Sequence, residues 1–426
     1  MSNWSAKNPY NSKLTNNYVL NGEGSRKETR HLVFDLGDSG LEYKAGDALG
    51  VIPACPLDMV EELLSLGGFT GQEEVETHLG PCELRDALTN RYEIHRVSKK
   101  WLVGLGSRVA SGDGRISISI VKRVRTSTVD GSSILSWDGS GEGEDVPAGY
   151  TEICSPNDYA EELWNNLTSD SKEMEDYMWT RDYLDALGDF GHIGFTPQEF
   201  IEGMNRLKPR LYSIASSPEH EKGTVHLTVG IVRYSYHDRD RTGLTTGFLA
   251  DRCTAGETSI GVFMSPTRSF ILPEDGKTDC IMVGPGTGIA PFRAFLQQRD
   301  INGDQGRNWL FFGDRTESGE YYYKEEMDDW KERGVLDKHD LAWSRDGTEK
   351  VYVQHLMKKH GEEIWNWLDN GGYFYVCGDK SRMAKDVHKT LIGICAEYGG
   401  MSEDEAKSYV EDGMMKSEKR YLRDVY

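Results

Sequence analysis

The arrangement of apolar and polar positions divides the chain into segments with different periodicities. Short runs typical of β-strands lie at 31–36 and 46–51, with a Gly-Asp-Ser-Gly turn between them. Similar runs return from about 209 to 273, the longest of them at 224–234. Runs of this length bounded by turn residues indicate adjacent strands of an antiparallel barrel.

Between the two β-rich parts the apolar positions recur with a helical period, over 57–101 and again over 157–205. The stretch 107–156 is less regular, with a β-like run at 116–121 and an acidic loop at 138–145, and we interpret it as an insertion. We therefore expect a barrel domain over 1–275 that contains a helical insert at about 55–205.

From residue 279 onward, continuously apolar β runs alternate with amphipathic helices. The β runs lie at 280–283, 309–312, 340–343 and 373–376, and the helices at 290–298, 324–333, 353–368 and 381–398. Strands of this kind alternating with helices predict a doubly wound parallel sheet covered on both faces, here a second domain over 276–426. The expected fold class is thus α+β followed by α/β, and no internal repeat is present.

Composition and charge narrow the classes of function. The chain has 426 residues, of which 70 are acidic and 49 basic, so its net charge of −21 argues against nucleic-acid and anionic-membrane partners. No apolar run of 18 residues predicts a membrane span, and the polar start up to Tyr10 lacks a signal-peptide core. The cysteines are odd in number and widely spaced, at positions 55, 82, 154, 253, 280, 377 and 395. We expect neither a metal site nor a disulfide framework, and a cytoplasmic location.

A glycine-rich turn, Gly284-Pro-Gly-Thr-Gly-Ile-Ala-Pro291, follows a buried strand and opens a helix. Glycines at such a turn let the backbone approach a pyrophosphate, whose charge the helix N-terminus favours. The spacing differs from the usual Gly-x-Gly-x-x-Gly fingerprint, and a tight turn that needs positive φ values is the alternative interpretation.

Polar residues follow the third and fourth strands of the predicted parallel sheet. Ser344-Arg345, with Lys350, Tyr352 and Gln354 after them, lies where such a sheet binds ligands, and the two cations suit a 2′-phosphate. A solvated basic loop is the alternative. Cys377-Gly-Asp379 ends the fourth strand, where the cysteine either faces a ligand crevice or is a small buried residue.

Two further segments carry candidate chemistry. Arg210-Leu-Tyr-Ser-Ile-Ala-Ser216 offers a cation, a flat aromatic ring and a hydroxyl, and Gly243-Leu-Thr-Thr-Gly247 offers backbone N–H groups to an anion. An ordinary strand with a Ser/Thr-rich hairpin is the alternative. The aromatic end, Arg420 to Tyr426, predicts a docked last strand rather than a frayed terminus.

In this order the motifs resemble the FAD- and NADP-binding reductase module of the diflavin reductases, whose core the ferredoxin–NADP reductases share. The chain is most similar to the sulfite reductase flavoprotein branch of that family. Asn8-Pro-Tyr10 and the segment 31–51 also resemble the start of the module. The resemblance covers nearly the whole chain and is weakest over 107–156.

The resemblance implies the following roles. FAD would be bound by Arg210, Leu211, Tyr212, Ser213, Thr228, Val229, Gly230, Tyr234, Gly243, Leu244, Thr245, Thr246 and Tyr426. NADP would be bound by Arg30, Gly286, Thr287, Gly288, Ser344, Arg345, Lys350, Tyr352, Gln354 and Asp386. Ser213, Cys377 and Asp424 match the hydride-transfer site, and Tyr426 would stack on the flavin and gate it.

The family resemblance also implies an activity and partners. The expected enzyme takes hydride from NADPH onto FAD and passes electrons to a sulfite reductase haem subunit, a flavodoxin-like carrier or a ferredoxin-like carrier. The alternatives are the reverse reaction toward NADP⁺ and a redox-inactive structural subunit. The family carries an FMN-binding domain before the segment matched here, whereas only seven residues precede Asn8 in this sequence. We therefore expect FAD and NADPH but no FMN.

Overall fold

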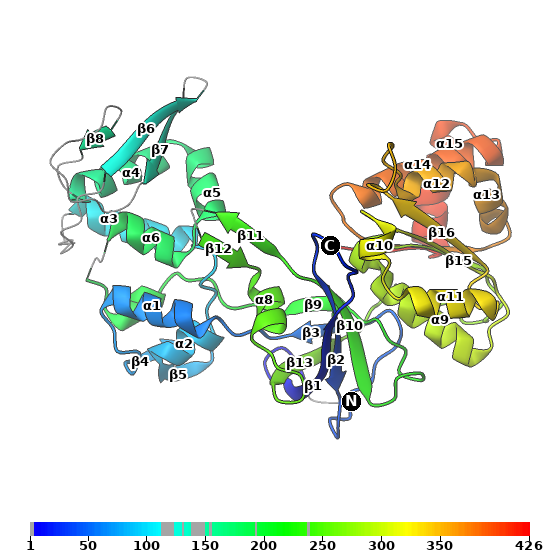
Figure 1. The fold of residues 1–426 in the computed structure, drawn as a ribbon, viewed down its shortest axis with the longest axis horizontal. Helices are drawn as coiled ribbons and strands as arrows, with labels where there is room; N and C mark the ends of the chain where they lie inside the picture. Colours follow the sequence, from blue (N-terminus) through cyan, green and yellow to red (C-terminus); the bar gives the residue numbers. More distant parts are fainter. Residues whose placement is uncertain are drawn as a thin grey trace. The chain divides into compact units, whose positions relative to one another are not determined.

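The computed structural model describes residues 4–111, 123–129, 132–137, 150–152, 156–191, 194–236 and 239–426. The predicted β run at 116–121, the acidic loop at 138–145 and Cys154 lie outside the described residues. The chain divides into two units, and each is described by itself. One unit joins Met1–Pro53 to Pro209–Tyr426, and the other is Ala54–Lys208 (Figure 1).

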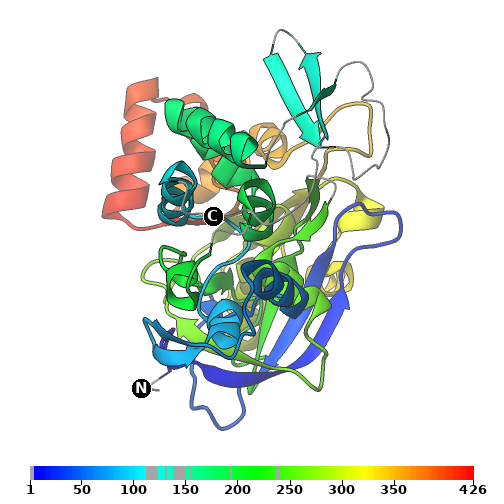
Figure 2. The same ribbon diagram turned by 90° about the vertical axis from the view of Figure 1, so that its left-hand side faces the viewer.

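The first unit begins with an antiparallel sheet of six strands in the order β10-β2-β1-β13-β3-β9. The strands are β1 Tyr10–Val19, β2 Thr29–Asp35, β3 Ala48–Val51, β9 Arg210–Ser213, β10 Thr224–Gly230 and β13 Ser259–Ser265. Figure 2 shows the blue strands β1 and β2 beside the green β10. A bridge between Ile214, just after β9, and Leu227 in β10 joins the two ends of the sheet. This closure makes the sheet the predicted barrel.

Alternating side chains fill the interior of this barrel. Leu32 and Phe34 of β2, Leu49 of β3 and Leu227 of β10 are all fully buried in one apolar cluster. Because strand side chains alternate between the two faces, each of these strands can line the interior with every second residue. Burial of each such side chain contributes roughly 1.5–3 kcal/mol. A short ribbon of β11 Arg233–Tyr236 and β12 Arg239–Thr242 follows β10, and α8 Leu244–Asp251 begins directly after it.

The second half of the same unit is a five-stranded parallel sheet in the order β16-β15-β14-β17-β18. The strands are β14 Cys280–Val283, β15 Asn308–Asp314, β16 Lys338–Trp343, β17 Tyr373–Gly378 and β18 Tyr421–Val425. The helices are η1 Gly286–Ile289, α9 Ala290–Asn302, α10 Glu317–Glu320, α11 Lys324–Glu332, α12 Val353–Lys359, α13 Gly361–Asp369, α14 Met383–Gly399, α15 Glu403–Ser408 and the π-helix η2 Tyr409–Ser417.

Alternate residues of the parallel strands enter two separate cores. Ile281 and Val283 of β14 pack with α12, α13 and α14, whereas Cys280 and Met282 pack with α9 and α11. A strand that is buried on both faces needs a continuous apolar run, which explains the pattern seen in the sequence. The predicted fold class, a barrel with a helical insert followed by a doubly wound parallel sheet, is confirmed.

The unit Ala54–Lys208 is mainly helical among its described residues. Its helices are α1 Leu57–Gly67, α2 Leu84–Asn90, α3 Lys99–Ser111, α4 Pro156–Ser169, α5 Ser171–Thr180, α6 Tyr183–Phe190 and α7 Pro197–Ile201. Its strands are β4 Glu74–Thr77, β5 Gly80–Glu83, β6 Arg123–Val129, β7 Ser132–Trp137 and β8 Tyr150–Glu152. A groove of about 890 Å³ in this unit is lined by residues that include Arg96 and Trp179, and by none of the predicted site residues.

Several predicted elements differ from the structure in their extent. The predicted helical stretch 57–101 contains the β4–β5 hairpin, which turns at Gly80 with a φ of +98°. The predicted helix 353–368 breaks at His360, whose ring nitrogen lies 3.2 Å from an oxygen of Asp340 on β16. The run 224–234 is two strands, because β10 pairs with β2 and β11 pairs with β12.

No helix in the part of the chain that the structure describes is long and apolar enough to cross a membrane.

Candidate active site

Two side chains, from β9 and β17, converge on one carboxylate of β18. Ser213 at the end of β9 donates a hydrogen bond from Oγ to Asp424 Oδ2 at 2.5 Å, and Cys377 Sγ lies 3.9 Å from the same oxygen. Cys377 and Asp424 are register partners in β17 and β18, so the parallel pairing sets them side by side. The barrel thus meets the C-terminal edge of the parallel sheet at the predicted hydride-transfer residues.

The Cys377 thiol is fully buried in this cluster. Burial, and then the neighbouring Asp424 carboxylate, raise the pKa of Cys377 well above the ordinary value. The side chain is therefore a neutral S–H group at neutral pH rather than a nucleophilic thiolate. Cys377 is therefore not poised to attack a ligand.

Tyr426 is the last residue of the chain and lies beside the glycine-rich turn. Its phenol oxygen is 2.9 Å from Thr287 Oγ1, and its backbone N–H donates to the Gly378 carbonyl at 3.1 Å. The side chain nevertheless remains 62% exposed. The terminus is thus fixed by its backbone while the ring keeps an open face for a flat ligand.

Strand β9 carries the predicted FAD motif from Arg210 to Ser213 and pairs with β3, where Leu49 lies opposite Tyr212 and Ala48 opposite Ser213. Leu211 is 57% exposed and Arg210 is exposed as well. Within the described residues no ion-pair partner of Arg210 is found. Burial raises the pKa of the Tyr212 phenol. An unpaired cation beside a half-buried ring fits a phosphate attached to a flat ring system.

The segment Gly243–Thr246 forms the N-terminus of α8. Gly243 is the N-cap residue, and an added Cβ there would lie 2.6 Å from Thr246 Oγ1 and 3.1 Å from Val232 Cβ, so a side chain would have to displace these neighbours. Leu244 and Thr245 are buried, and Thr245 Oγ1 has no hydrogen-bond partner among the described residues. Unpaired amides of the first helical turn, together with an unsatisfied hydroxyl, fit an anionic ligand such as the FAD pyrophosphate.

The predicted FAD residues on β10 and β11 lie in different surroundings. The Thr228 hydroxyl is 2.6 Å from the Tyr323 phenol, and Val229 is buried. A Cβ on Gly230 would lie 3.4 Å from Thr287, so this end of β10 borders the glycine-rich turn. Tyr234 is 48% exposed on the separate ribbon.

The glycine-rich turn after β14 is packed too tightly for side chains. A Cβ on Gly284 would lie 2.4 Å from the Gly288 carbonyl, and one on Gly288 would lie 2.2 Å from the Cys377 carbonyl. Gly286 has a φ of +59°. A positive φ therefore accounts for Gly286 alone, whereas close packing accounts for Gly284 and Gly288. The same turn also opens η1 and α9, so their first amides face the ligand edge of the sheet beside Thr287.

The residues after β16 include two exposed cations, Arg345 and Lys350, with the acidic Asp346 and Glu349 between them in the sequence. Ser344 donates from both its backbone N–H and its Oγ to the Asp314 carbonyl, at 2.9 and 3.1 Å. Arg345 and Lys350 are exposed and have no ion-pair partner in the ranges that the structure describes. Tyr352 is 44% exposed. On a chain with a net charge of −21, two unpaired cations beside an aromatic ring fit a phosphate on an adenosine.

Two predicted NADP residues lie together and one lies elsewhere. Gln354 Nε2 donates to Asp386 Oδ2 at 3.5 Å, which joins α12 to the first turn of α14. Arg30 lies on the barrel strand β2, where it donates to Glu28 at 2.6 Å and to Asn17 at 3.1 Å. The structure therefore does not bring Arg30 to the Ser344–Gln354 surface.

Sequence reasoning did not identify two cations near this edge. Arg315 follows β15, and its carbonyl accepts the Arg345 N–H at 2.8 Å, so the two arginines leave adjacent strands together. Lys27, from the loop between β1 and β2, pairs with Asp314 at the end of β15. Arg315 directly follows a strand, as Ser344 does, so its position in the sequence could have identified it as a candidate ligand-binding cation. Lys27 lies 287 positions from Asp314, and no local pattern predicts their contact.

Comparisons with known proteins agree with this geometry. The family described as "FAD binding domain" matches residues 2–111 and 155–248, and "Oxidoreductase NAD-binding domain" matches residues 282–389. The chain is 37% identical over its whole length to a Bacillus subtilis protein named "Sulfite reductase [NADPH] flavoprotein alpha-component", of which it covers 62%. It is 36% identical to proteins of the same name from Mannheimia succiniciproducens and Vibrio cholerae, of which it covers 62% and 60%. The chain thus spans about three fifths of the length of these relatives.

Proposed function

We propose that this chain, which belongs to the family of FAD- and NADP-binding reductase modules of the diflavin reductases, takes hydride from NADPH onto FAD and passes electrons to a separate protein. The observation that carries the proposal is the convergence of Ser213, Cys377 and Asp424 between the two halves of one unit. Each half matches the binding domain of one cofactor, so this cluster borders both.

On the FAD side, the chain's own residues would bind and orient the cofactor. Arg210 and the N-terminus of α8 at Gly243–Thr246 offer charge and amides to the pyrophosphate, and Tyr212 and Tyr426 offer flat surfaces to the ring system. When bound, FAD supplies the ability to accept a hydride and release electrons singly, which no side chain here can do. Ser213 would hold a hydroxyl proton close to the reacting edge of the ring.

On the NADP side, selectivity for the 2′-phosphate would come from cations. Arg345 and Lys350 are exposed without ion-pair partners in the described part of the chain, and Ser344 directly follows strand β16. A guanidinium can hold a phosphate through two parallel hydrogen bonds. NADPH should therefore be preferred over NADH.

Tyr426 would occupy the place that the nicotinamide needs on the flavin. Its ring is largely exposed, and among the described residues its side chain hydrogen-bonds to Thr287. Displacement of the ring would break that bond while the backbone of the terminus stays paired with β17. Movement of this ring would thus gate hydride transfer.

The proposed electron acceptor is a sulfite reductase haem subunit, because relatives that span this whole chain are named as sulfite reductase components. Flavodoxin-like and ferredoxin-like carriers are the second candidates. Such carriers are acidic, and a chain with a net charge of −21 would repel them unless its cations were concentrated where they dock. The charge therefore favours a dedicated partner. The free state of the six described cysteines supports a cytoplasmic location.

The test is anaerobic mixing of the FAD-loaded protein with NADPH, followed by addition of each candidate acceptor. Bleaching of the flavin band by NADPH, and its recovery with the haem subunit, is the expected result. A protein that binds no FAD, or whose flavin stays oxidised with NADPH, would instead be a structural subunit. If a reduced carrier reduces NADP⁺ through the protein faster than NADPH reduces the carrier, the protein works in the reverse direction.

A further inference from the structure

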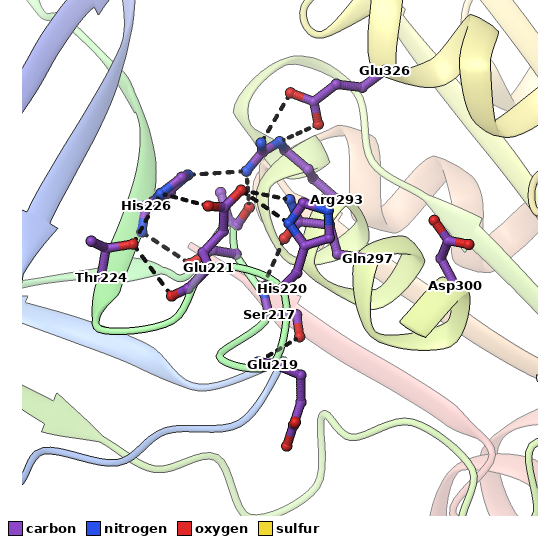
Figure 3. A network of polar contacts seen from close by, with 12 residues as sticks. Ser217, Glu219, His220, Glu221, Thr224, His226, Arg293, Gln297, Asp300 and Glu326 are labelled. Atoms are coloured by element: carbon purple, nitrogen blue, oxygen red, sulfur yellow. Dashed lines mark hydrogen bonds and ion pairs between the residues drawn. The ribbon is translucent and has the colours of Figure 1, made fainter. Parts of the chain in front are cut away.

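A buried cation joins the two halves of the first unit at a point that the proposed function does not explain. Arg293 lies one turn into α9 and is only 5% exposed. Its Nε and Nη2 donate to the two oxygens of Glu326 at 2.7 and 2.9 Å (Figure 3). Both residues belong to the parallel-sheet half, so this pair alone links only α9 to α11.

The third nitrogen of Arg293 reaches into the barrel. Nη1 donates to the Ala215 carbonyl at 2.7 Å and lies 3.4 Å from His226 Nδ1. Ala215 follows Ser213 by two residues, and its own N–H donates to the His226 carbonyl at 2.8 Å. Arg293 therefore binds the backbone of the segment that presents Ser213.

A second contact of the same kind lies next to the first. Tyr323 precedes α11 with a φ of +58°, and its phenol oxygen is 2.9 Å from His31 Nδ1 and 2.6 Å from Thr228 Oγ1. The Arg293 guanidinium lies 4.8 Å from the centre of the Tyr323 ring. Arg293 thus supports both polar contacts between α11 and the barrel strands β2 and β10.

The chemistry of this cluster indicates a positional role. Apolar residues of similar volume often stabilise a fold as well as a buried ion pair does, so such a pair is poorly explained by stability alone. What an arginine adds is direction, because its planar fork fixes three hydrogen bonds at once. Helix α9 carries Arg293 in its first turn, directly after Thr287 and Gly288 of η1. One rigid element therefore touches both the glycine-rich turn and the Ser213 segment.

We propose that Arg293 is a positioning residue that fixes the segment Arg210–Ser216 relative to α9, and so sets the distance between the reacting atoms of the two cofactors. This inference rests on the proposed hydride transfer. Hydride transfer needs reacting atoms about 3–3.5 Å apart, and a displacement of 1 Å can reduce the rate about 100-fold. Arg293 touches neither Ser213 nor Asp424 and acts through the Ala215 carbonyl.

The same helix supplies a matched control. Arg299 is also buried, at 1% exposure, but its guanidinium donates to the carbonyls of Thr278 and Gly306 inside the parallel-sheet half. Arg293→Met and Arg299→Met each remove a buried guanidinium from α9, and only the first removes a bond to the barrel. Glu326→Gln is a milder variant, because it keeps the shape of the carboxylate and Glu326 is partly exposed.

The experiment measures three quantities in the full chain: single-turnover flavin reduction by NADPH, affinity for 2′,5′-ADP, and amide hydrogen exchange. For Arg293→Met we expect reduction about 100-fold slower, unchanged 2′,5′-ADP affinity, and faster exchange over 213–217. Arg293→Lys should recover part of the rate. Arg299→Met should lower thermal stability but leave the reduction rate within about twofold of wild type.

Equal rates in wild type and Arg293→Met, or equal slowing in Arg293→Met and Arg299→Met, would overturn the positioning role. If Arg293→Met fails to fold, Arg293→Lys and Glu326→Gln test the positioning role instead. Wild-type reduction rates and wild-type exchange in both variants would overturn that role. Failure of the proposed function is distinguishable, since wild-type flavin would then stay oxidised with NADPH. The exchange of 213–217 would still report whether Arg293 holds that segment.

Discussion

Asp424 Oδ2 lies 2.5 Å from Ser213 Oγ, although the two residues are 211 positions apart in the chain. Ser213 ends a barrel strand, and Asp424 lies in the last strand of the parallel sheet. Both halves must fold and dock before this bond can form. The integrity of the bond therefore reports on the geometry of the whole site.

Replacement of Asp424 by Asn should slow flavin reduction by NADPH on the order of 10- to 100-fold. The variant keeps the volume of the side chain but removes the negative charge that Ser213 and Cys377 face. Stopped-flow measurement of the flavin band gives the rate, and FAD content is measured in parallel. Arg423→Ala, one position earlier in β18 on an exposed side chain, is the control and should be neutral. Wild-type rates in Asp424→Asn would remove Asp424 from the site.

Replacement of Arg345 by Ala should reduce the preference for NADPH over NADH by roughly 10- to 100-fold. A charged hydrogen bond to a phosphate is worth about 1.5–3 kcal/mol, and NADH lacks that phosphate. The ratio of kcat/KM for the two nucleotides measures the effect. Arg307→Ala is the matched control, because Arg307 pairs with Asp279 just before β15, at the opposite edge of the sheet. An unchanged ratio in Arg345→Ala would mean that the 2′-phosphate binds elsewhere.

Removal of Tyr426 should open the flavin face to nicotinamides. The Tyr426 ring bonds to Thr287, and β18 itself ends at Val425, so loss of Tyr426 should leave the pairing of β18 with β17 intact. We expect higher NADH use, tighter NADP⁺ binding and a shifted flavin spectrum. Steady-state kinetics and the spectrum of the FAD-loaded protein measure these changes, with Tyr398→Ala on α14 as the control. Kinetics and a spectrum that match wild type would exclude a gate at Tyr426.

Acid should destabilise the barrel through two buried histidines. Burial, and then Arg293, lower the pKa of His31 from 6.5 to about 2 and that of His226 to about 4. Because both pKa values are depressed in the folded state, the stability is complete above pH 6.5. It falls as pH drops toward those values, since the unfolded chain takes up protons first. The loss should approach about 1.4 kcal/mol per pH unit for each histidine.

Urea unfolding at pH 7.5 and pH 5 measures this loss. In His31→Gln the absolute stability will differ, but the free energy of unfolding should fall less steeply between the two pH values than in wild type. Identical slopes in the two proteins would show that His31 does not take part in the acid response.

Replacement of Gly288 by Ala should disrupt the nucleotide turn. The new Cβ would lie 2.2 Å from the Cys377 carbonyl, so either the turn or β17 must move. We expect lower thermal stability and a loss of 2′,5′-ADP and NADP⁺ affinity, read by melting and by titration. Gly393→Ala is the control, because it lies in α14 with open space around it and should stabilise the helix by about 1 kcal/mol. Normal nucleotide binding by Gly288→Ala would show that this turn tolerates a side chain.

Local pattern was sufficient for much of the architecture. The continuous apolar run at 280–283 predicted a strand buried on both faces, and it is β14. The motif 284–291 predicted a turn and a helix after that strand, and they are η1 and α9. Such features depend on neighbours in the chain, which is why periodicity and turn residues reveal them.

The sequence by itself determined the class of fold, the order of its two binding domains and the kinds of residue that can hold their cofactors. Only the tertiary structure decided which of those residues meet. It joined Ser213 to Asp424, left Arg30 paired with Glu28 on the barrel, and placed Arg293 against the Ala215 carbonyl. These contacts join residues brought together by the packing of whole elements, by strand register or by a turn of the backbone. The Glu28–Arg30 pair is local in the chain, whereas the contacts of Ser213 and Arg293 join distant residues and depend on the packing of whole strands and helices.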